Sequence, residues 1–314
     1  MDEALKNDLP DSFEPMTAKE LRQSLRRGSF VYPFLIIQIF AVVAMTVEFQ
    51  VGHDAESTEY TGMMNVAMLF MSGPFWMVVA AICMVLMPMA GVMLMGQELE
   101  EGNHELLLLT KLNRWKVVFG KFATLWGLCA LTFISLLPYV VVRYLIGGVE
   151  WWHEATCGLT VLGGSSIIAA GAIGASSFQR IPARLAVLAL FFCSMGFGCG
   201  VPLFFSAMVS KGCGVIYHLT ALAAVLCYTA LGLGLARSRL RLSVLAYEMN
   251  PSAMIIGILV FAPFVIGLLT AVTWTMGGWV ALLGVGFVAT RVDMTPKAPS
   301  WMPPPPPNVP VADA

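Results

Sequence analysis

The segment GQELEEGNHELLLLTKLNRWKVVFGK, residues 96–121, is the one long, strongly charged stretch in a chain that otherwise avoids charge. It lies between two apolar runs, with its acidic residues first, then four leucines, then its basic residues. The chain of 314 residues is 58% hydrophobic and only 12% charged, roughly half the charged fraction of a typical soluble domain. The composition therefore predicts an all-α polytopic membrane helix bundle.

Apolar runs long enough to cross a bilayer, which takes about 20 residues, recur along the chain. Residues 249–290 contain no charged residue. A single helix of about 38 of them would be about 57 Å long, nearly twice the roughly 30 Å hydrocarbon core, so we expect a hairpin that turns at TMGGW, 275–279. Pro74 and Pro88 are expected to kink the overlong second run. Six spans and the hairpin give about eight crossings, and the six spans lie near residues 30–50, 63–95, 117–142, 155–178, 185–209 and 213–235.

The basic residues orient the predicted spans. All of them except Arg143 and Lys211 fall on the side that carries the N-terminus. Because lysine and arginine are enriched in cytoplasmic loops, both ends of the chain and the segment 96–121 are predicted to be cytoplasmic. The acidic, polar N-terminus lacks the pattern of a cleavable signal peptide.

The charged segment has the features of a short helix lying in the membrane interface. Acidic residues come at or before the start of residues 103–116 and basic residues end them, and both placements favour the helix dipole. Leu112, Trp115 and Phe119 recur at helical spacing, and Gly102 permits a turn out of the preceding span. A solvated loop whose charges only set the topology and a docking element for a cytoplasmic partner both fit this pattern.

The segment resembles the first cytoplasmic loop of the type-2 permease family of ATP-binding cassette (ABC) transporters. In that loop an acid-rich stretch runs into a glycine, a glutamate, a leucine run ending in threonine, and a glycine-lysine pair that opens the next span. This chain departs from the family at Asn103 and Lys111, where threonine and proline are usual. The matching positions are Glu98, Glu101, Gly102, Glu105, Leu106 to Leu109, Thr110, Gly120 and Lys121.

The resemblance extends upstream of the first span. Residues 17–30 are similar to the elbow helix that precedes the spans of the family, and Thr17 and Glu20 are placed as a capping box. In architecture the similarity covers about residues 15–235.

The resemblance implies a permease subunit of the exporter type, in a bacterial plasma membrane, that binds a separate ABC ATPase subunit and a second, identical or different, permease. Lipids are its other partner, and no basic patch suggests nucleic acid. The chain is not expected to be an enzyme or to bind ATP, because Trp115 and Phe122 occupy positions where a Walker A loop needs glycine and serine or threonine. The implied coupling residues are Glu98, Glu101, Gly102, Glu105, Thr110, Arg114 and Lys121, with a second contact at Arg180 and Arg184.

The predicted segments follow one another along the chain. They are a cytoplasmic tail and elbow helix (1–29), a six-span permease domain (30–235), a basic linker (236–252), a membrane hairpin (253–290) and a proline-rich tail (291–314).

Other polar residues offer alternatives. His218 is an ionisable residue inside a span and a functional candidate. Glu48 either meets a cation or the transport pathway or marks the membrane boundary, and His153 with Glu154 either binds a metal or joins an interfacial aromatic cluster. The GGSS stretch, 163–166, favours close helix packing over an intramembrane protease, whose GxSG motif is missing.

The cysteines give no framework. The seven cysteines show no CxxC pair or regular spacing, which argues against a zinc site, and a Cys157–Cys213 bridge is a minor alternative. The alternative to a permease is a membrane scaffold or assembly protein that uses the charged loop to bind another cytoplasmic partner.

Overall fold

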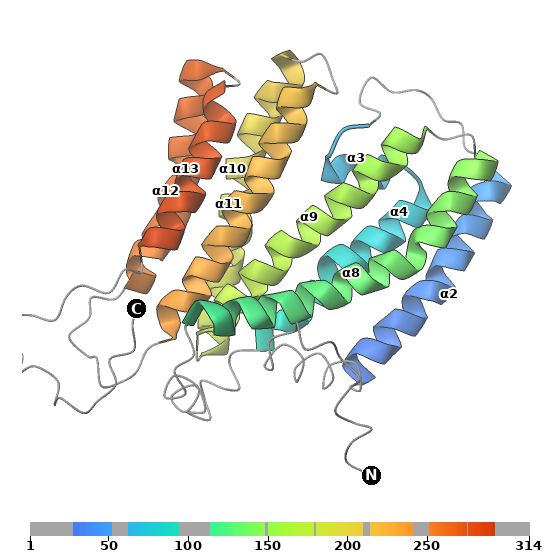
Figure 1. Ribbon diagram of the computed structural model, residues 1–314, viewed down its shortest axis with the longest axis horizontal. Helices are drawn as coiled ribbons and strands as arrows, with labels where there is room; N and C mark the ends of the chain where they lie inside the picture. The colour runs from blue at the N-terminus through green and yellow to red at the C-terminus, as the bar shows by residue number, and fades with distance from the viewer. Residues whose placement is uncertain are drawn as a thin grey trace, which may run out of the picture.

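The computed structural model shows a bundle of helices standing side by side, with α12 and α13 at one end and α2 at the other (Figure 1). Within the residues that it describes, every regular element is a helix, and six helices are long and apolar enough to cross a membrane. This confirms the predicted all-α membrane class. The described residues are 28–51, 62–93, 114–147, 150–178, 180–209, 214–240, 251–274 and 276–292.

Five of the predicted spans appear as single helices within a few residues of their expected bounds. Because lipid offers no partners for backbone amides, a spanning segment must satisfy its hydrogen bonds internally, and these apolar runs do so as helices. Helix α8 is the longest and begins at the basic residues that precede its expected span. The helices are α2 (Gly28–Val51), α8 (Arg114–Gly147), α9 (Trp151–Ser176), α10 (Ile181–Val209) and α11 (Val215–Arg239).

The second apolar run, predicted as one span over 63–95, contains a single candidate span only from Pro74 to Met93, so its predicted start was too early. It breaks at Gly73, whose φ of 109° is a conformation that favours glycine, and Pro74 then begins the next helix. The amide of Met87, next to Pro88, bonds to the Ile82 carbonyl in a π-helical pattern, which accommodates the proline. The pieces are α3 (Val66–Met71), α4 (Pro74–Val79), the π-helix η1 (Ala80–Leu86), α5 (Met87–Met89) and the 3₁₀ helix η2 (Ala90–Met93).

The charge-free C-terminal run is a hairpin, as its length predicted. Helices α12 (Pro251–Thr273) and α13 (Met276–Arg291) are separated at Trp274, one residue before the expected turn. The apolar parts of α2 and α13 are shorter than the six clear spans, so the count of eight crossings stays a prediction. The hairpin shares a core with α10 and α11, and a Cβ placed on Gly286 would lie 3.0 Å from the Cys227 Cα.

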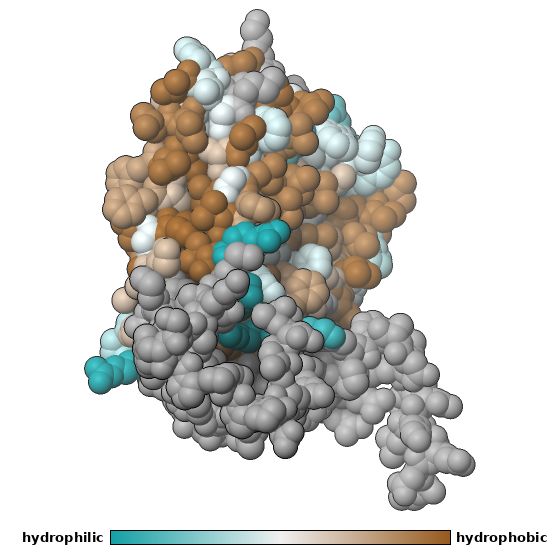
Figure 2. Space-filling model, turned by 60° about the vertical axis from the view of Figure 1, so that its left-hand side comes forward, coloured by the Kyte–Doolittle hydropathy of each residue, from teal (hydrophilic) through white to brown (hydrophobic). Residues whose placement is uncertain are grey.

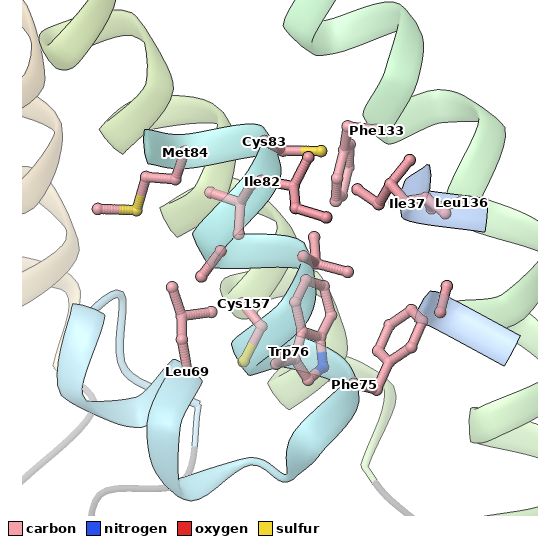
Figure 3. Close-up of a cluster of buried hydrophobic side chains, with 14 of the residues drawn as sticks. Ile37, Leu69, Phe75, Trp76, Ile82, Cys83, Met84, Phe133, Leu136 and Cys157 are labelled. Carbon is pink, nitrogen blue, oxygen red and sulfur yellow. The ribbon is translucent and has the colours of Figure 1, made fainter. Parts of the chain in front are cut away.

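A second core gathers around α4 and η1. Trp76 and Phe75 are fully buried there, against Ile37 of α2 and Leu136 of α8 (Figure 3). The outer surface is different, because α12 exposes large apolar side chains such as Phe264. Figure 2 shows a face that is mostly apolar, with its hydrophilic residues gathered toward one end. Such a surface suits contact with lipid tails.

Candidate functional site at the two ends of the bundle

One end of the bundle collects basic side chains, and we call it the basic side. Helix α8 begins there, α10 begins there, and α11 and α13 end there. The segment 94–113 starts from η2 and returns to α8 on this side. Its basic residues in and next to the described helices are Arg114, Lys116, Lys121, Arg180, Arg184, Arg237, Arg239 and Arg291.

Most of the predicted coupling residues fall outside the described residues. Those residues are Glu98, Glu101, Gly102, Glu105 and Thr110. From Arg114 onward, the expected interfacial helix over 103–116 is continuous with α8 rather than separate from it. Lys121 lies about two turns further along α8 and is buried, with 2% of its surface exposed.

Two arginines from other helices contact the described residues on either side of segment 94–113. Arg184 of α10 is buried and donates from Nη1 to the Met93 sulfur, 3.5 Å away, just before the segment begins. Arg237 of α11 stacks over the Trp115 ring, 4.8 Å from its centroid, just after the segment ends. The described residues on either side of 94–113 are therefore held against α10 and α11.

The second predicted contact loop, 178–184, is also held by an arginine hydrogen bond and by an arginine stacked on an aromatic ring. Arg184 donates from Nε to the Phe178 carbonyl at 2.5 Å, which closes the turn before α10. Arg239 of α11 lies over the Phe178 ring, 4.7 Å from its centroid. Arg180 is exposed just before α10 begins. Of the two predicted residues, Arg184 is thus buried within the bundle and Arg180 is exposed.

The opposite end, which we call the far side, contains a buried ion-pair triad made of Glu48, Arg143 and Glu154. Arg143 Nη2 lies 2.7 Å from the Glu48 Oε1 and its Nε donates to the same oxygen at 2.8 Å. Arg143 Nη1 donates to the Glu154 Oε1 at 2.6 Å. All three side chains are buried. Buried charges inside a membrane bundle are costly and face its interior, so they mark functional candidates.

The triad also ties in the break between α3 and α4. Arg143 Nη2 donates to the Ser72 carbonyl oxygen. The Trp76 indole N–H donates to the second oxygen of Glu154 at 3.1 Å. A Cβ on Gly73 would lie 2.9 Å from the Glu48 Oε1, so only glycine leaves room for this carboxylate. Each of the three guanidinium nitrogens has an acceptor within the chain.

His153 completes the far side as a neutral imidazole. The Gly62 amide donates to its Nδ1 at 3.2 Å, so that nitrogen carries no proton. The Nε2 proton is then donated to the Ser72 hydroxyl at 2.8 Å, and that hydroxyl donates to the Met68 carbonyl oxygen. The Cys157 sulfur lies 3.5 Å from the same hydroxyl.

The sequence missed this triad but contained its signals. Arg143 was one of two basic residues off the basic side, and Glu48 was expected to meet either a cation or the membrane boundary; it meets the cation. His153 and Glu154 are buried, and no group of three metal-ligating side chains occurs among the described residues. His218 sits between the Trp152 and Tyr217 rings.

The remaining sequence alternatives concern small polar residues. Ser165 and Ser166 donate to carbonyls of their own helix, and Ser166 also lies 3.2 Å from the Thr229 hydroxyl, which fits helix packing. Cys157 is a free thiol, and Cys213 lies outside the described residues.

The fold and these two regions define a polytopic helical membrane protein with a basic side and a charged, buried far side. Comparisons with protein-family models, curated proteins and solved structures find no match for the chain.

Proposed function

We propose that the chain is the permease subunit of an ABC exporter, driven by a separate ATPase that docks on the segment 96–121. The observation that carries the proposal is that Arg184 contacts Met93, just before this segment, and Arg237 stacks over Trp115, near its end. These contacts join η2 and α8, the helices on either side of residues 94–113, to α10 and α11. A force applied to the segment would thus reach four parts of the bundle.

The motif matched in the sequence supports the choice of partner. An acidic turn followed by a leucine run and a glycine-lysine pair is the pattern with which type-2 permeases meet their ATPase. Docking drives a change only if the ATPase binds one arrangement of the bundle better than the other. On this proposal the acidic residues Glu101 and Glu105 contact the ATPase, and α8 transmits the movement of the ATPase to the bundle.

The proposal also assigns an orientation and a location. Because basic loops stay in the cytoplasm, the basic side faces the cytoplasm and the far side faces outward. The membrane is the plasma membrane of a bacterium, and a second permease, identical or different, completes the pathway.

The test is co-purification followed by ATP turnover. The full chain is expected to bring down an ATPase with a Walker A motif, and the pair is expected to hydrolyse ATP faster than the ATPase alone. Reversal of Glu101 and Glu105 to lysine should abolish this stimulation while the chain still accumulates in the membrane.

A reversal outside the segment, compared with each single reversal of Glu101 and Glu105, controls for net charge. Asp293 follows α13 in the sequence and lies outside the charged segment, so Asp293→Lys should leave the stimulation intact. Recovery of a cytoplasmic partner without nucleotide hydrolysis would instead favour the scaffold, and loss of stimulation in both variants would remove the assignment of the segment.

A further inference from the structure

The far side is covered by a short segment, residues 62–73, which we call the cap. It consists of a turn, the six-residue helix α3, and the Ser72–Gly73 break. Side chains of three other helices hold it. Arg143 of α8 donates to the Ser72 carbonyl, His153 of α9 contacts the Gly62 amide and the Ser72 hydroxyl, and the Tyr217 hydroxyl of α11 donates to the Met64 carbonyl at 3.2 Å.

The cap is joined to α4 at a natural hinge. Gly73 has φ 109° and ψ 171°, a region that essentially only glycine occupies. On one side of this residue lies α3, and on the other Pro74 fixes the start of α4. A rotation about Gly73 therefore moves the cap while leaving the proline-stiffened start of α4 in place.

The guanidinium of Arg143 fastens the cap and does not present a site for an anion. Its three nitrogens donate to two carboxylates and to the Ser72 carbonyl. The carboxylates belong to α2 and α9, so the arginine is held firmly from both sides. Among these partners, the cap is the one that Arg143 contacts through a backbone atom, the Ser72 carbonyl oxygen.

The Arg143–Ser72 contact joins the two helical runs that flank residues 94–113. From segment 94–113, one run leads back through η2, α5, η1 and α4 to Gly73, and the other leads forward through α8 to Arg143. A shift of α8 against the run from η2 to α4, begun at the basic side, would act on the Arg143–Ser72 contact at the far side. No other pair of neighbouring helical runs in the described bundle starts from the charged segment.

We propose that residues 62–73 are a movable cap, hinged at Gly73 and fastened by Arg143, which opens when α8 shifts against α4 and thereby uncovers Cys157. Cys157 is 1% exposed, its sulfur lies 3.5 Å from the Ser72 hydroxyl, and it shares a buried cluster with Leu69 of α3 (Figure 3). The source of the shift rests on the proposed function, but the cap itself does not.

The thiol of Cys157 is a built-in reporter of the opening. The purified full chain, without any ATPase, is treated with a charged thiol reagent, and modification at each cysteine is followed by peptide mass spectrometry. Arg143→Gln removes a hydrogen bond that a charged group donates to the cap, so it should raise the rate of Cys157 modification about tenfold or more. Cys129, buried in the same core, should stay unmodified and so report an intact bundle.

A second variant controls for the loss of any polar contact to α2. Gln38 donates to the Ser135 hydroxyl of α8 at 2.7 Å, away from the cap, so Gln38→Leu should leave Cys157 protected. An unchanged rate at Cys157 in Arg143→Gln, with Cys129 protected, would overturn the proposal. Since this assay contains no ATPase, its failure is separate from a failure of the transport assignment.

If Arg143→Gln does not fold, hydrogen exchange on the wild-type chain decides the matter. Helix α3 stands alone on one side of the hinge, whereas α4 continues into η1 on the other, so a moving cap requires amides of α3 to exchange faster than those of α4. Equal exchange in the two helices would overturn the proposal as well.

Discussion

Gly174 of α9 and Gly232 of α11 approach so closely that a Cβ placed on Gly174 would lie 2.8 Å from the Gly232 carbonyl oxygen. In the other direction, a Cβ on Gly232 would lie 2.6 Å from the Ala170 carbonyl oxygen. Backbone atoms, unlike the end of a flexible side chain, cannot move to make room for a Cβ. Small residues at such crossings let transmembrane helices pack without a hydrophobic driving force, and here they join the two most buried spans.

Gly232→Ala should therefore destabilise the bundle by about 1–3 kcal/mol, the usual cost of overpacking. The measurement is the thermal unfolding of the purified chain in detergent. Gly196→Ala is the control, because a Cβ there meets nothing within 4 Å and alanine favours helix over glycine. Equal melting temperatures for the two variants would contradict the close crossing.

The α10–α11 contact offers a double-mutant test. The Tyr228 hydroxyl donates to the Ser194 carbonyl at 2.7 Å, and a Cβ on Gly198 would overlap that hydroxyl. Tyr228→Phe alone should cost about 0.5–1.5 kcal/mol, and Gly198→Ala alone should cost more. Combined, they should cost less than their sum, because removing the hydroxyl makes room for the methyl group. Additive costs by thermal unfolding would show that Gly198 and Tyr228 do not meet.

The sequence was sufficient to predict where most of the long helices lie. Charge-free runs of bilayer length gave α2 and α8 to α11, and the excess length of 249–290 required the hairpin that turns at Trp274. The Gly73–Pro74 pair inside the second run was a visible signal of a break, but Pro74 by itself predicts only a kink. The short helix α3 was missed for that reason.

The triad could not be predicted because it depends on how the helices are rotated. Spans that are apolar on all sides carry no stripe that tells which face is turned inward. Glu48, Arg143 and Glu154 could be placed at one level of the membrane, yet their meeting is decided by packing among α2, α8 and α9. The ionisable residues themselves were the one available clue.

The triad should respond unequally to removal of its members. Arg143→Met leaves two buried carboxylates without their cation and should cost about 3–5 kcal/mol. Glu154→Gln keeps the Glu48–Arg143 pair and an acceptor for the Trp76 indole, so it should cost less. Thermal unfolding of both variants measures the order.

Removing the charges together tests whether the penalty is electrostatic. A triple variant, Glu48→Gln, Arg143→Met and Glu154→Gln, buries no unpaired charge and should be more stable than Arg143→Met alone. A triple variant no more stable than the single one would indicate that the arginine acts through packing instead.

A cross-link can hold the cap closed. The Ser72 hydroxyl lies 3.5 Å from the Cys157 sulfur, so Ser72→Cys places two thiols side by side, within reach of a disulfide. Oxidation with copper phenanthroline should join the cap to α9, and ATP-driven export in vesicles should then stop. A reductant should restore it, because the block is only the new bond.

The control for this experiment is the same substitution without its partner thiol. Ser72→Cys combined with Cys157→Ser cannot form the bond, so the oxidant should not affect its export. ATP hydrolysis stimulated by the chain distinguishes the two proposals. If ATP hydrolysis continues while export is blocked, the cross-linked cap causes the block and the ATPase is still docked. Export that persists through a complete cross-link means that the cap does not have to move.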